Sequence, residues 1–485
     1  MNVRLVFNVV GRILKIEGAL MLVPMLVAVF YQEPMLHVIS FLIPATITYI
    51  LGFIFSYKSD DYRNLYTIEG FMIVGISWIL LSLMGSFPYM MSGVLPHFGD
   101  AFFETASGFT TTGATVIDSV GPDTRSILFW RAFSQWIGGM GVLVFAFAVL
   151  PKSRSQTQFI MQAEAPGTQL EKLQSRVSSS ARLLLVFYIV LTLIVAVLLI
   201  FGGFSFFDSL LIAFGVSATG GFSQYKDPIA RILVSPYVEV VITLGMFIFG
   251  ANFNLFYLAI KGQFREIWKN EELRWYVGIV LGAAILITLN LTANGYNFTS
   301  SLRHGFFNST SMVTTTAYLT EDFTVWPVFS RTLLNILMFT GAMSGSTAGG
   351  LKISRLAILF KNAMAGVKQL TYPNRIVTVH FNGRVIDNSA LKEIVNYFFI
   401  YIVVFVIGMF IVNLEVDDFL TAFSTSASML NNIGVGFELV GPSYNYAFFS
   451  QPMKIFLSLL MIMGRLEIYP ILILFSGTLW RRRHI

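Results

Sequence analysis

The stretch ETASGFTTTGATV, Glu104–Val116, joins an apolar run to a cluster of threonines and glycines. It lies between two strongly apolar segments, 68–91 and 127–150, each long enough to cross a membrane. Within a bilayer, non-helical backbone is tolerated only where it is buried in protein or lines a water-filled path. If the pattern recurs along the chain, several such stretches can surround one common path.

The composition is that of a membrane protein. The chain has 485 residues, of which 55% are hydrophobic and 12% are charged, whereas soluble domains carry about 25% charged residues. The absence of cysteine excludes disulfides and thiolate metal sites. The histidines show no metal-binding spacing, and GSTAGGLK at 345–352 lacks the Gly-Lys-Ser/Thr of a phosphate-binding loop. We therefore expect a polytopic membrane protein that is not an enzyme.

The distribution of basic residues predicts the orientation. Most of the 32 Lys and Arg residues fall at the N-terminus, in alternate links between the apolar segments, or in WRRRH at 480–484. By the positive-inside rule this side is cytoplasmic, so both termini are expected in the cytoplasm and no nucleic-acid partner is expected. The predicted spans are 14–31, 37–56, 68–91, 127–150, 181–202, 236–260, 275–293, 328–363, 391–413 and 452–480.

The opening pattern recurs after alternate spans. The four versions are DAFFETASGFTTTGA, FDSLLIAFGVSATGG, HGFFNSTSMVTTTA and DDFLTAFSTSASMLNNIGVG. Taking Gly113, Gly220, Ala317 and Gly434 as equivalent places them roughly 100 residues apart, an internal repeat. Each repeat reads as a span, an apolar segment too short to cross the membrane, a polar loop and a second span. The expected fold is all-α.

Four such loops around one axis would present a ring of backbone carbonyl and hydroxyl oxygens. Such oxygens can replace the hydration shell of a small cation, and glycine permits the positive φ that aims a carbonyl at the axis. A turn at the membrane edge is the simpler interpretation of one loop, but it does not explain four in register.

The span 328–363 is too long for a single crossing even with tilt. Its middle, TGAMSGSTAGG at 340–350, consists almost wholly of Gly, Ala, Ser and Thr, so we expect an unwound loop across the path. Close packing of small residues between helices is the alternative. Arg465 lies within the last span, where a charge indicates a functional site. It is expected to face this loop and the path, the alternative being a structural ion pair with another helix.

These patterns resemble the superfamily of K⁺ transporters that includes the TrkH, KtrB and HKT proteins, with bacterial TrkH nearest because two spans precede the repeats. Further matches are QWIGGMGVLVFA at 135–146, AEAPG at 163–167, GAMSGSTAGGLKISR at 341–355 and GRLEIYP at 464–470. The resemblance implies four M1–P–M2 repeats arranged like a K⁺-channel tetramer, with K⁺ bound in a filter and no organic cofactor. It also implies a homodimer in the lipid of the cytoplasmic membrane, on a cytosolic TrkA-like nucleotide-binding ring.

The expected units are an extension at 1–66 and repeats at 67–170, 171–273, 274–388 and 389–485, the third with a broken M2 helix. By match to the family, the filter residues are Thr110, Thr111, Thr112, Gly113, Ala114, Ser217, Ala218, Thr219, Gly220, Gly221, Thr314, Thr315, Thr316, Ala317, Tyr318, Asn431, Asn432, Ile433, Gly434 and Val435. The gate residues are Gly341, Ala342, Met343, Ser344, Gly345, Ser346, Thr347, Ala348, Gly349, Gly350 and Arg465.

The chain departs from the family at Ala317, where glycine is usual. We expect the third loop to avoid the strain of a positive φ by turning a carbonyl away from the axis, which would weaken K⁺ selectivity. The function expected is a pore for K⁺ uptake; the alternatives are a symporter coupling K⁺ to H⁺ or Na⁺, and a weakly selective K⁺/Na⁺ channel. A non-transporting receptor leaves the four loops unexplained. The segment 371–384 alternates like a hairpin that docks a partner, or is a solvated link.

Overall fold

The computed structural model describes residues 3–57, 67–117, 124–141, 177–223, 235–374 and 377–476. Within these ranges, six helices are long and apolar enough to cross a membrane, and α12 with α13, bent by 95°, would make a seventh. The chain is therefore an all-helical, multi-pass membrane protein. AEAPG at 163–167, WRRRH at 480–484 and part of the segment 135–146 lie outside the described residues.

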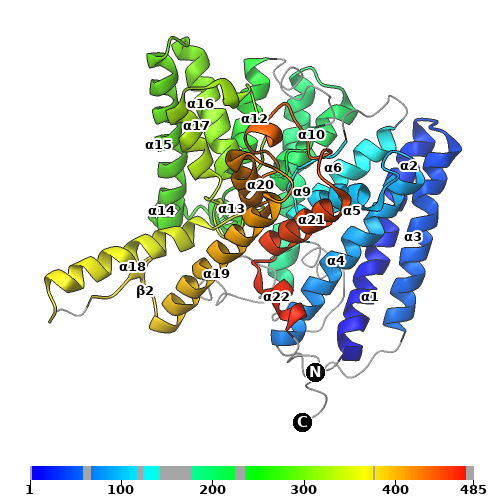
Figure 1. The fold of residues 1–485 in the computed structure, drawn as a ribbon, viewed down its shortest axis with the longest axis horizontal. Coiled ribbons are helices and arrows are strands. Elements are labelled where there is room, and N and C mark those ends of the chain that lie inside the picture. Colours follow the sequence, from blue (N-terminus) through cyan, green and yellow to red (C-terminus); the bar gives the residue numbers. More distant parts are fainter. Residues whose placement is uncertain are drawn as a thin grey trace.

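The helices follow one another in groups that repeat along the chain (Figure 1). Three helices precede the repeats: α1 (Val3–Leu20), α2 (Leu22–Phe30) and α3 (Met35–Ser56). They form the two predicted spans, because α1 and α2 together make one candidate span and α3 the other. The first group is α4 (Thr67–Met91), α5 (Phe98–Phe109) and α6 (Arg125–Gly139). The second is α9 (Val177–Phe201), α10 (Phe206–Ala218), α12 (Pro236–Phe249) and α13 (Phe253–Ile260), followed by α14 (Phe264–Lys269).

The third group is α15 (Glu271–Ala293), α16 (Phe298–Val313), α17 (Val328–Leu337) and α18 (Ile353–Thr371). The fourth is α19 (Asn388–Val412), α20 (Phe419–Asn431), α21 (Gln451–Arg465) and α22 (Tyr469–Phe475). In every group a long first helix precedes a half-helix of 12 to 16 residues, namely α5, α10, α16 or α20. The structure thus confirms the predicted order of span, half-helix, loop and second helix.

Two predicted spans are interrupted, which corrects the sequence analysis. The segment 236–260 breaks between α12 and α13. The segment 452–480 breaks between α21 and α22, where Glu467 and Ile468 adopt φ values of 57° and 67°. Positive φ in a β-branched residue such as isoleucine is rare and strained. Both breaks adjoin the small-residue loop at 341–350, whose contacts are described below.

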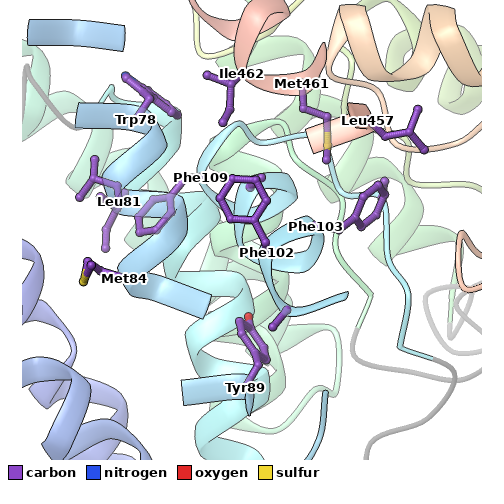
Figure 2. Close-up of a cluster of buried hydrophobic side chains, with 14 of the residues drawn as sticks. Trp78, Leu81, Met84, Tyr89, Phe102, Phe103, Phe109, Leu457, Met461 and Ile462 are labelled. Carbon is purple, nitrogen blue, oxygen red and sulfur yellow. The ribbon is translucent and has the colours of Figure 1, made fainter. Parts of the chain in front are cut away.

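The centre of the first repeat is an apolar core shared with the last one. Side chains of α4, α5 and α21 meet there, among them Trp78, Phe103, Phe109 and Leu457, all fully or almost fully buried (Figure 2). Burial of aromatic side chains of this size dominates the energetics of a core. This packing holds the half-helix α5 between the first and fourth repeats.

The predicted hairpin is present on the side of the molecule where α18 and α19 meet. Strands β1 (His380–Phe381) and β2 (Arg384–Val385) pair antiparallel across a turn at Asn382 and Gly383. The backbone N–H of Glu271 donates to the Asn382 side chain at 2.6 Å, and the Glu271 carboxylate accepts the Asn382 N–H at 3.1 Å. The hairpin is therefore attached to the first residue of α15.

Glycines allow α1 and α3 to pack with their backbones in close contact. A Cβ on Gly52 would lie 2.6 Å from the Gly11 carbonyl oxygen, and a Cβ on Gly18 would lie 2.7 Å from the Ala45 carbonyl oxygen. Real Cβ atoms do not approach backbone atoms this closely. Small residues at such interfaces are the usual basis of helix association in membranes.

We predict that Gly52→Val destabilises the protein by about 1–3 kcal/mol through overpacking. The control is Gly282→Val in α15. Both variants replace a glycine inside a helix by valine, but a Cβ at position 282 has no neighbour within 4 Å. Thermal unfolding in detergent measures both. Equal unfolding temperatures for the two variants would contradict the predicted close packing of α1 on α3.

Candidate functional site

The half-helices α5, α10, α16 and α20 each lead into one of the four predicted loops. Three of them begin at a side-chain cap, Ser205, Asn297 or Asp418, whose oxygen accepts a hydrogen bond from a backbone N–H of the first turn. Their last residues are buried. None is long enough to cross a membrane, so each carries the chain into the protein interior and stops there.

Each half-helix ends in the same cap, a Schellman motif, in which an N–H beyond the helix bonds to a carbonyl of its last turn. The bonds, each 2.9 Å long, run from Thr112 to Ser107, Gly220 to Gly215, Thr316 to Ser311 and Ile433 to Ser428. In a trans peptide the N–H and C=O groups point in opposite directions. The preceding carbonyls, those of Thr111, Thr219, Thr315 and Asn432, therefore point away from their half-helices.

Two residues in each loop have positive φ, with one ordinary residue between them. They are Thr111 and Gly113 (57° and 79°), Thr219 and Gly221 (52° and 65°), Thr315 and Ala317 (55° and 58°), and Asn432 and Gly434 (55° and 93°). In a regular extended chain, successive carbonyls point to opposite sides. A left-handed conformation at every second residue turns them toward the same side, so each loop can present several carbonyls in one direction.

This register corrects the second loop and the expectation for Ala317. Gly221, not Gly220, is the equivalent of Gly113 and Gly434. Each of the three has a positive φ, and in each loop the residue just before it donates the Schellman hydrogen bond. Ala317 does not escape the left-handed region: its φ is 58°. The third loop therefore bears the strain of an alanine in this conformation, on the order of 1 kcal/mol or more.

Three of the four junctions between neighbouring loops are close backbone contacts. A Cβ on Gly113 would overlap the carbonyl oxygen of Gly220, one on Gly221 would overlap that of Thr316, and one on Gly434 would overlap that of Thr112. These overlaps connect the first loop to the second, the second to the third and the fourth to the first. The third and fourth repeats meet through Arg331 and Glu438, whose side chains are 2.8 Å apart. We call residues 110–114, 218–222, 314–318 and 431–435 the loop ring, with the second range in the corrected register.

Most side-chain hydroxyls of the loop ring are already hydrogen-bonded. Thr110 and Thr112 bond to each other at 2.7 Å, and Thr314 and Thr316 do so at 2.8 Å. The Asn432 amide donates to the Thr112 hydroxyl at 3.0 Å. Because the hydroxyls are used within and between loops, the backbone carbonyls are the better candidates for binding a cation inside the ring. The sequence analysis expected both carbonyl and hydroxyl oxygens in the ring, and these hydrogen bonds favour the carbonyls.

The segment 341–350 is unwound, as predicted, between the end of α17 and the start of α18. We call it the small-residue loop. It is fixed by backbone bonds to the break after α12: the Met343 N–H donates to the Gly250 carbonyl at 3.1 Å, and the Phe253 N–H donates to the Gly345 carbonyl at 3.2 Å. The buried Glu272 carboxylate accepts the Ser344 N–H at 2.7 Å. The break between α12 and α13 thus supplies groups that hold the loop.

The small-residue loop touches the second and third loops of the ring through their left-handed threonines and the fourth through Asn432. The Gly349 N–H donates to the Thr315 hydroxyl at 2.9 Å, and the Thr219 hydroxyl donates to that of Thr347 at 3.3 Å. A Cβ on Gly349 would lie 2.8 Å from the Cβ of Asn432. Contact with the first loop runs through Arg465. The small-residue loop therefore lies across one end of the loop ring.

Arg465 joins three parts of the site. It donates to the Thr347 carbonyl and the Gly138 carbonyl, each at 2.7 Å, and to the Thr111 hydroxyl at 3.2 Å. The prediction that it faces the small-residue loop is confirmed, but it is the last residue of α21 and not the middle of a continuous span. Glu467, two residues later, pairs with Arg355 at 2.6 Å.

Beyond the small-residue loop lies a cavity of about 130 Å³. Its lining combines residues of the loop with the end of α6 and with two cationic side chains, Lys352 and Arg465. Lys352 is buried and donates to the carbonyls of Ala348 and Gly349. The small-residue loop therefore separates the loop ring from this cavity, whose lining also includes Glu467.

Sequence reasoning missed several residues that hold the site: Glu104, Arg131, Gln135, Glu272 and Lys352. A charged or amide side chain within an apolar segment was the available signal. Lys352 donates to carbonyls only three and four residues away. The partners of the other four lie farther away in the sequence, so their pairing could not be read from one chain. Among the residues that the structure describes, no group of three His, Asp or Glu side chains is arranged to hold a metal ion.

Comparisons with known proteins agree with this architecture. Residues 38–482 match the family model TrkH, cation transport protein. The chain is 34% identical to the Trk system potassium uptake protein TrkG of Escherichia coli K12, with 99% of each chain covered. It is 32% identical to the Trk system potassium uptake protein TrkH of Salmonella typhimurium, with 99% of this chain and 100% of the other covered.

The fold comparison extends along the whole chain. The crystal structure of the potassium transporter TrkH from Vibrio parahaemolyticus superimposes with a TM-score of 0.88 at 29% identity, covering 99% of this chain and 100% of the other. Sequence and fold therefore agree over the same length, and the chain belongs to the TrkH family of cation transport proteins.

Proposed function

We propose that this protein is the pore-forming subunit of a potassium uptake system in the cytoplasmic membrane, with K⁺ passing through the loop ring. The alternation of positive φ in all four loops carries the proposal. It turns successive carbonyls toward one side, and carbonyl oxygens are the groups that replace the hydration shell of K⁺ in selective channels. The potassium transport named for the similar proteins supports the choice of ion.

The small-residue loop is the gate in this proposal. It lies between the loop ring and the cavity lined by Lys352 and Arg465, and it is held by side chains from several repeats. A cation leaving the ring would meet this loop and the guanidinium of Arg465. Coulomb repulsion in surroundings of low dielectric opposes passage until the loop moves.

Partners and orientation follow from the same proposal. The Lys and Arg distribution supports cytoplasmic termini, and the beginning of α1 lies at the same end of the molecule as α22 (Figure 1). The hairpin β1–β2 is on the basic side and is tied to α15, the helix whose Glu272 holds the small-residue loop. A cytosolic TrkA-like ring bound there, beneath a homodimer, would be close to the gate.

The filter is tested by Gly113→Ser. A side chain there would overlap the Gly220 carbonyl and displace it, so we expect Na⁺ to enter alongside K⁺. The measurement is the Rb⁺/Na⁺ flux ratio in proteoliposomes, which should fall by about tenfold for each 1.4 kcal/mol of lost discrimination. Gly203→Ser is the control, because Gly203 also has a positive φ but no neighbour within 4 Å. A Gly113→Ser variant with the ratio of the native protein would show that the first loop is not a filter.

The gate is tested by shortening the loop within residues 343–349 and, separately, by Arg465→Ala. Either change removes bonds that hold the loop across the path, so Rb⁺ flux without a cytosolic partner should rise, by roughly tenfold for about 1.4 kcal/mol of lost closed-state stabilisation.

Arg303→Ala is the matched control for Arg465→Ala, because Arg303 pairs with Glu239 and not with the loop. Flux that stays the same or decreases in a folded Arg465→Ala protein would favour a purely structural role for this arginine. The same result in the shortened variant would exclude the loop as the gate.

The third loop is tested by Ala317→Gly. Glycine relieves the strain of a positive φ and removes the methyl group, which lies where the other loops have no room for one. We expect a measurable Na⁺ flux in the native protein and a higher Rb⁺/Na⁺ ratio in the variant. Parallel flux measurements on the two proteins decide this, and an unchanged ratio would mean that the ring accommodates Ala317 without loss.

A further inference from the structure

A buried ion pair lies behind the loop ring, between its first and second loops. The Arg131 Nε is 2.7 Å from a carboxylate oxygen of Glu104. The Glu104 side chain is wholly buried, and that of Arg131 is 4% exposed. Glu104 lies in the half-helix α5 and Arg131 in α6. Because burying two charges is costly unless both are well hydrogen-bonded, the contacts of this pair show what it stabilises.

On the Glu104 side, the pair holds the exit of the first loop. The carboxylate accepts the Thr115 hydroxyl at 3.0 Å and the Val116 N–H at 3.0 Å. Arg131 donates to the same Thr115 hydroxyl at 3.1 Å. Thr115 is two residues beyond Gly113. The backbone that leaves the first loop is therefore hydrogen-bonded to α5, the half-helix that leads into the same loop.

On the other side, Arg131 reaches the second loop. Its Nη1 donates to the Ser223 carbonyl at 3.1 Å, and its guanidinium lies 4.4 Å from the centre of the Phe222 ring. Both residues directly follow Gly221. Hydrogen bonds that involve an ionised group are roughly twice as strong as neutral ones. One guanidinium therefore fixes the exits of two neighbouring loops relative to each other.

One helical turn after Arg131, the buried Gln135 repeats this connection nearer the ring. Its side-chain amide donates to the Gly220 carbonyl at 2.7 Å and accepts the Phe222 N–H at 3.3 Å. Gly220 supplies the carbonyl that leaves no room for a side chain at Gly113. Residues i and i+4 share one face of a helix, so α6 holds the second loop at two levels.

The described hydrogen bonds that join the second loop to the third, and the fourth loop to the first, use uncharged groups. The Tyr318 hydroxyl donates to the Phe222 carbonyl at 3.3 Å between the second and third loops. The Asn432 amide donates to the Thr112 hydroxyl, and the Tyr446 N–H donates to the Thr115 carbonyl at 2.9 Å, between the fourth and first. Ion pairs also join the third and fourth repeats (Arg331–Glu438) and the fourth and first (Lys454–Asp100). Among the described residues, the Glu104–Arg131 pair is the one that hydrogen-bonds the backbone following two neighbouring loops.

We propose that Glu104, Arg131 and Gln135 are positioning residues that set the spacing of the first two loops and thereby the ion selectivity of the ring. The inference rests on the proposed function, since it assumes that the ring is the filter. Without these contacts the Gly220 carbonyl loses its fixed position beside Gly113. Oxygens that can move adapt to the smaller Na⁺, so discrimination falls while ions still pass.

The test uses Gln135→Met and the double variant Glu104→Gln/Arg131→Gln in proteoliposomes. Removing one charge alone leaves the other buried and unpaired, whereas the double change avoids that penalty. The control is Glu239→Gln/Arg303→Gln, which changes an ion pair between α12 and α16 that makes no hydrogen bond to the loop ring within the described part of the chain. We expect the Rb⁺/Na⁺ flux ratio to fall about five- to tenfold in both test variants, with Rb⁺ flux retained and the control unchanged.

A ratio equal to that of the native protein in either folded test variant would overturn the proposal for the residues it changes. If the double variant does not fold, Gln135→Met carries the test, because it removes no charge. A native protein that shows no preference for Rb⁺ over Na⁺ would refute the proposed filter itself. The two failures differ in the native protein. If the filter proposal is wrong, the native protein is unselective; if only the positioning proposal is wrong, the native protein and the variants are equally selective.

Discussion

The structure depends on one constraint: backbone polar groups inside a membrane protein must be hydrogen-bonded or face a path that supplies a partner. The four half-helices meet it in the same way. In each Schellman cap the backbone N–H groups bond back to the helix, for example Thr112 to Ser107, while the carbonyls of the next residues point the other way. In the proposed filter, four such caps convert an unfavourable feature, unwound backbone in the interior, into a ring of carbonyl oxygens.

The same caps explain why threonine and asparagine occupy the left-handed positions where glycine would be less strained. Thr219 and Thr315 bond to the small-residue loop, and Thr111 bonds to Arg465. Glycine at these positions would lose those bonds. The strain is thus compensated by contacts that connect the ring to the loop beneath it, so a movement of the loop changes the surroundings of all three residues.

Much of this could be predicted from the sequence because the signals are local. Apolar length distinguished the half-helices from the spans, and the run of small residues at 341–350 indicated an unwound segment. The register of the second loop could not be predicted, because two adjacent glycines, Gly220 and Gly221, satisfy the pattern equally and only the hydrogen bonds select one. The Glu104–Arg131 pair depends on packing between two helices, which a single sequence does not reveal.

The central claim is that the carbonyls of the loop ring bind the transported cation. Anomalous X-ray scattering from crystals of this protein grown in Rb⁺ tests it most directly, since Rb⁺ has nearly the size and coordination of K⁺. The account predicts Rb⁺ peaks on the axis of the ring, among the carbonyl oxygens of Thr111, Thr219, Thr315 and Asn432. Ordered Rb⁺ elsewhere along the path, with none inside the ring, would contradict it.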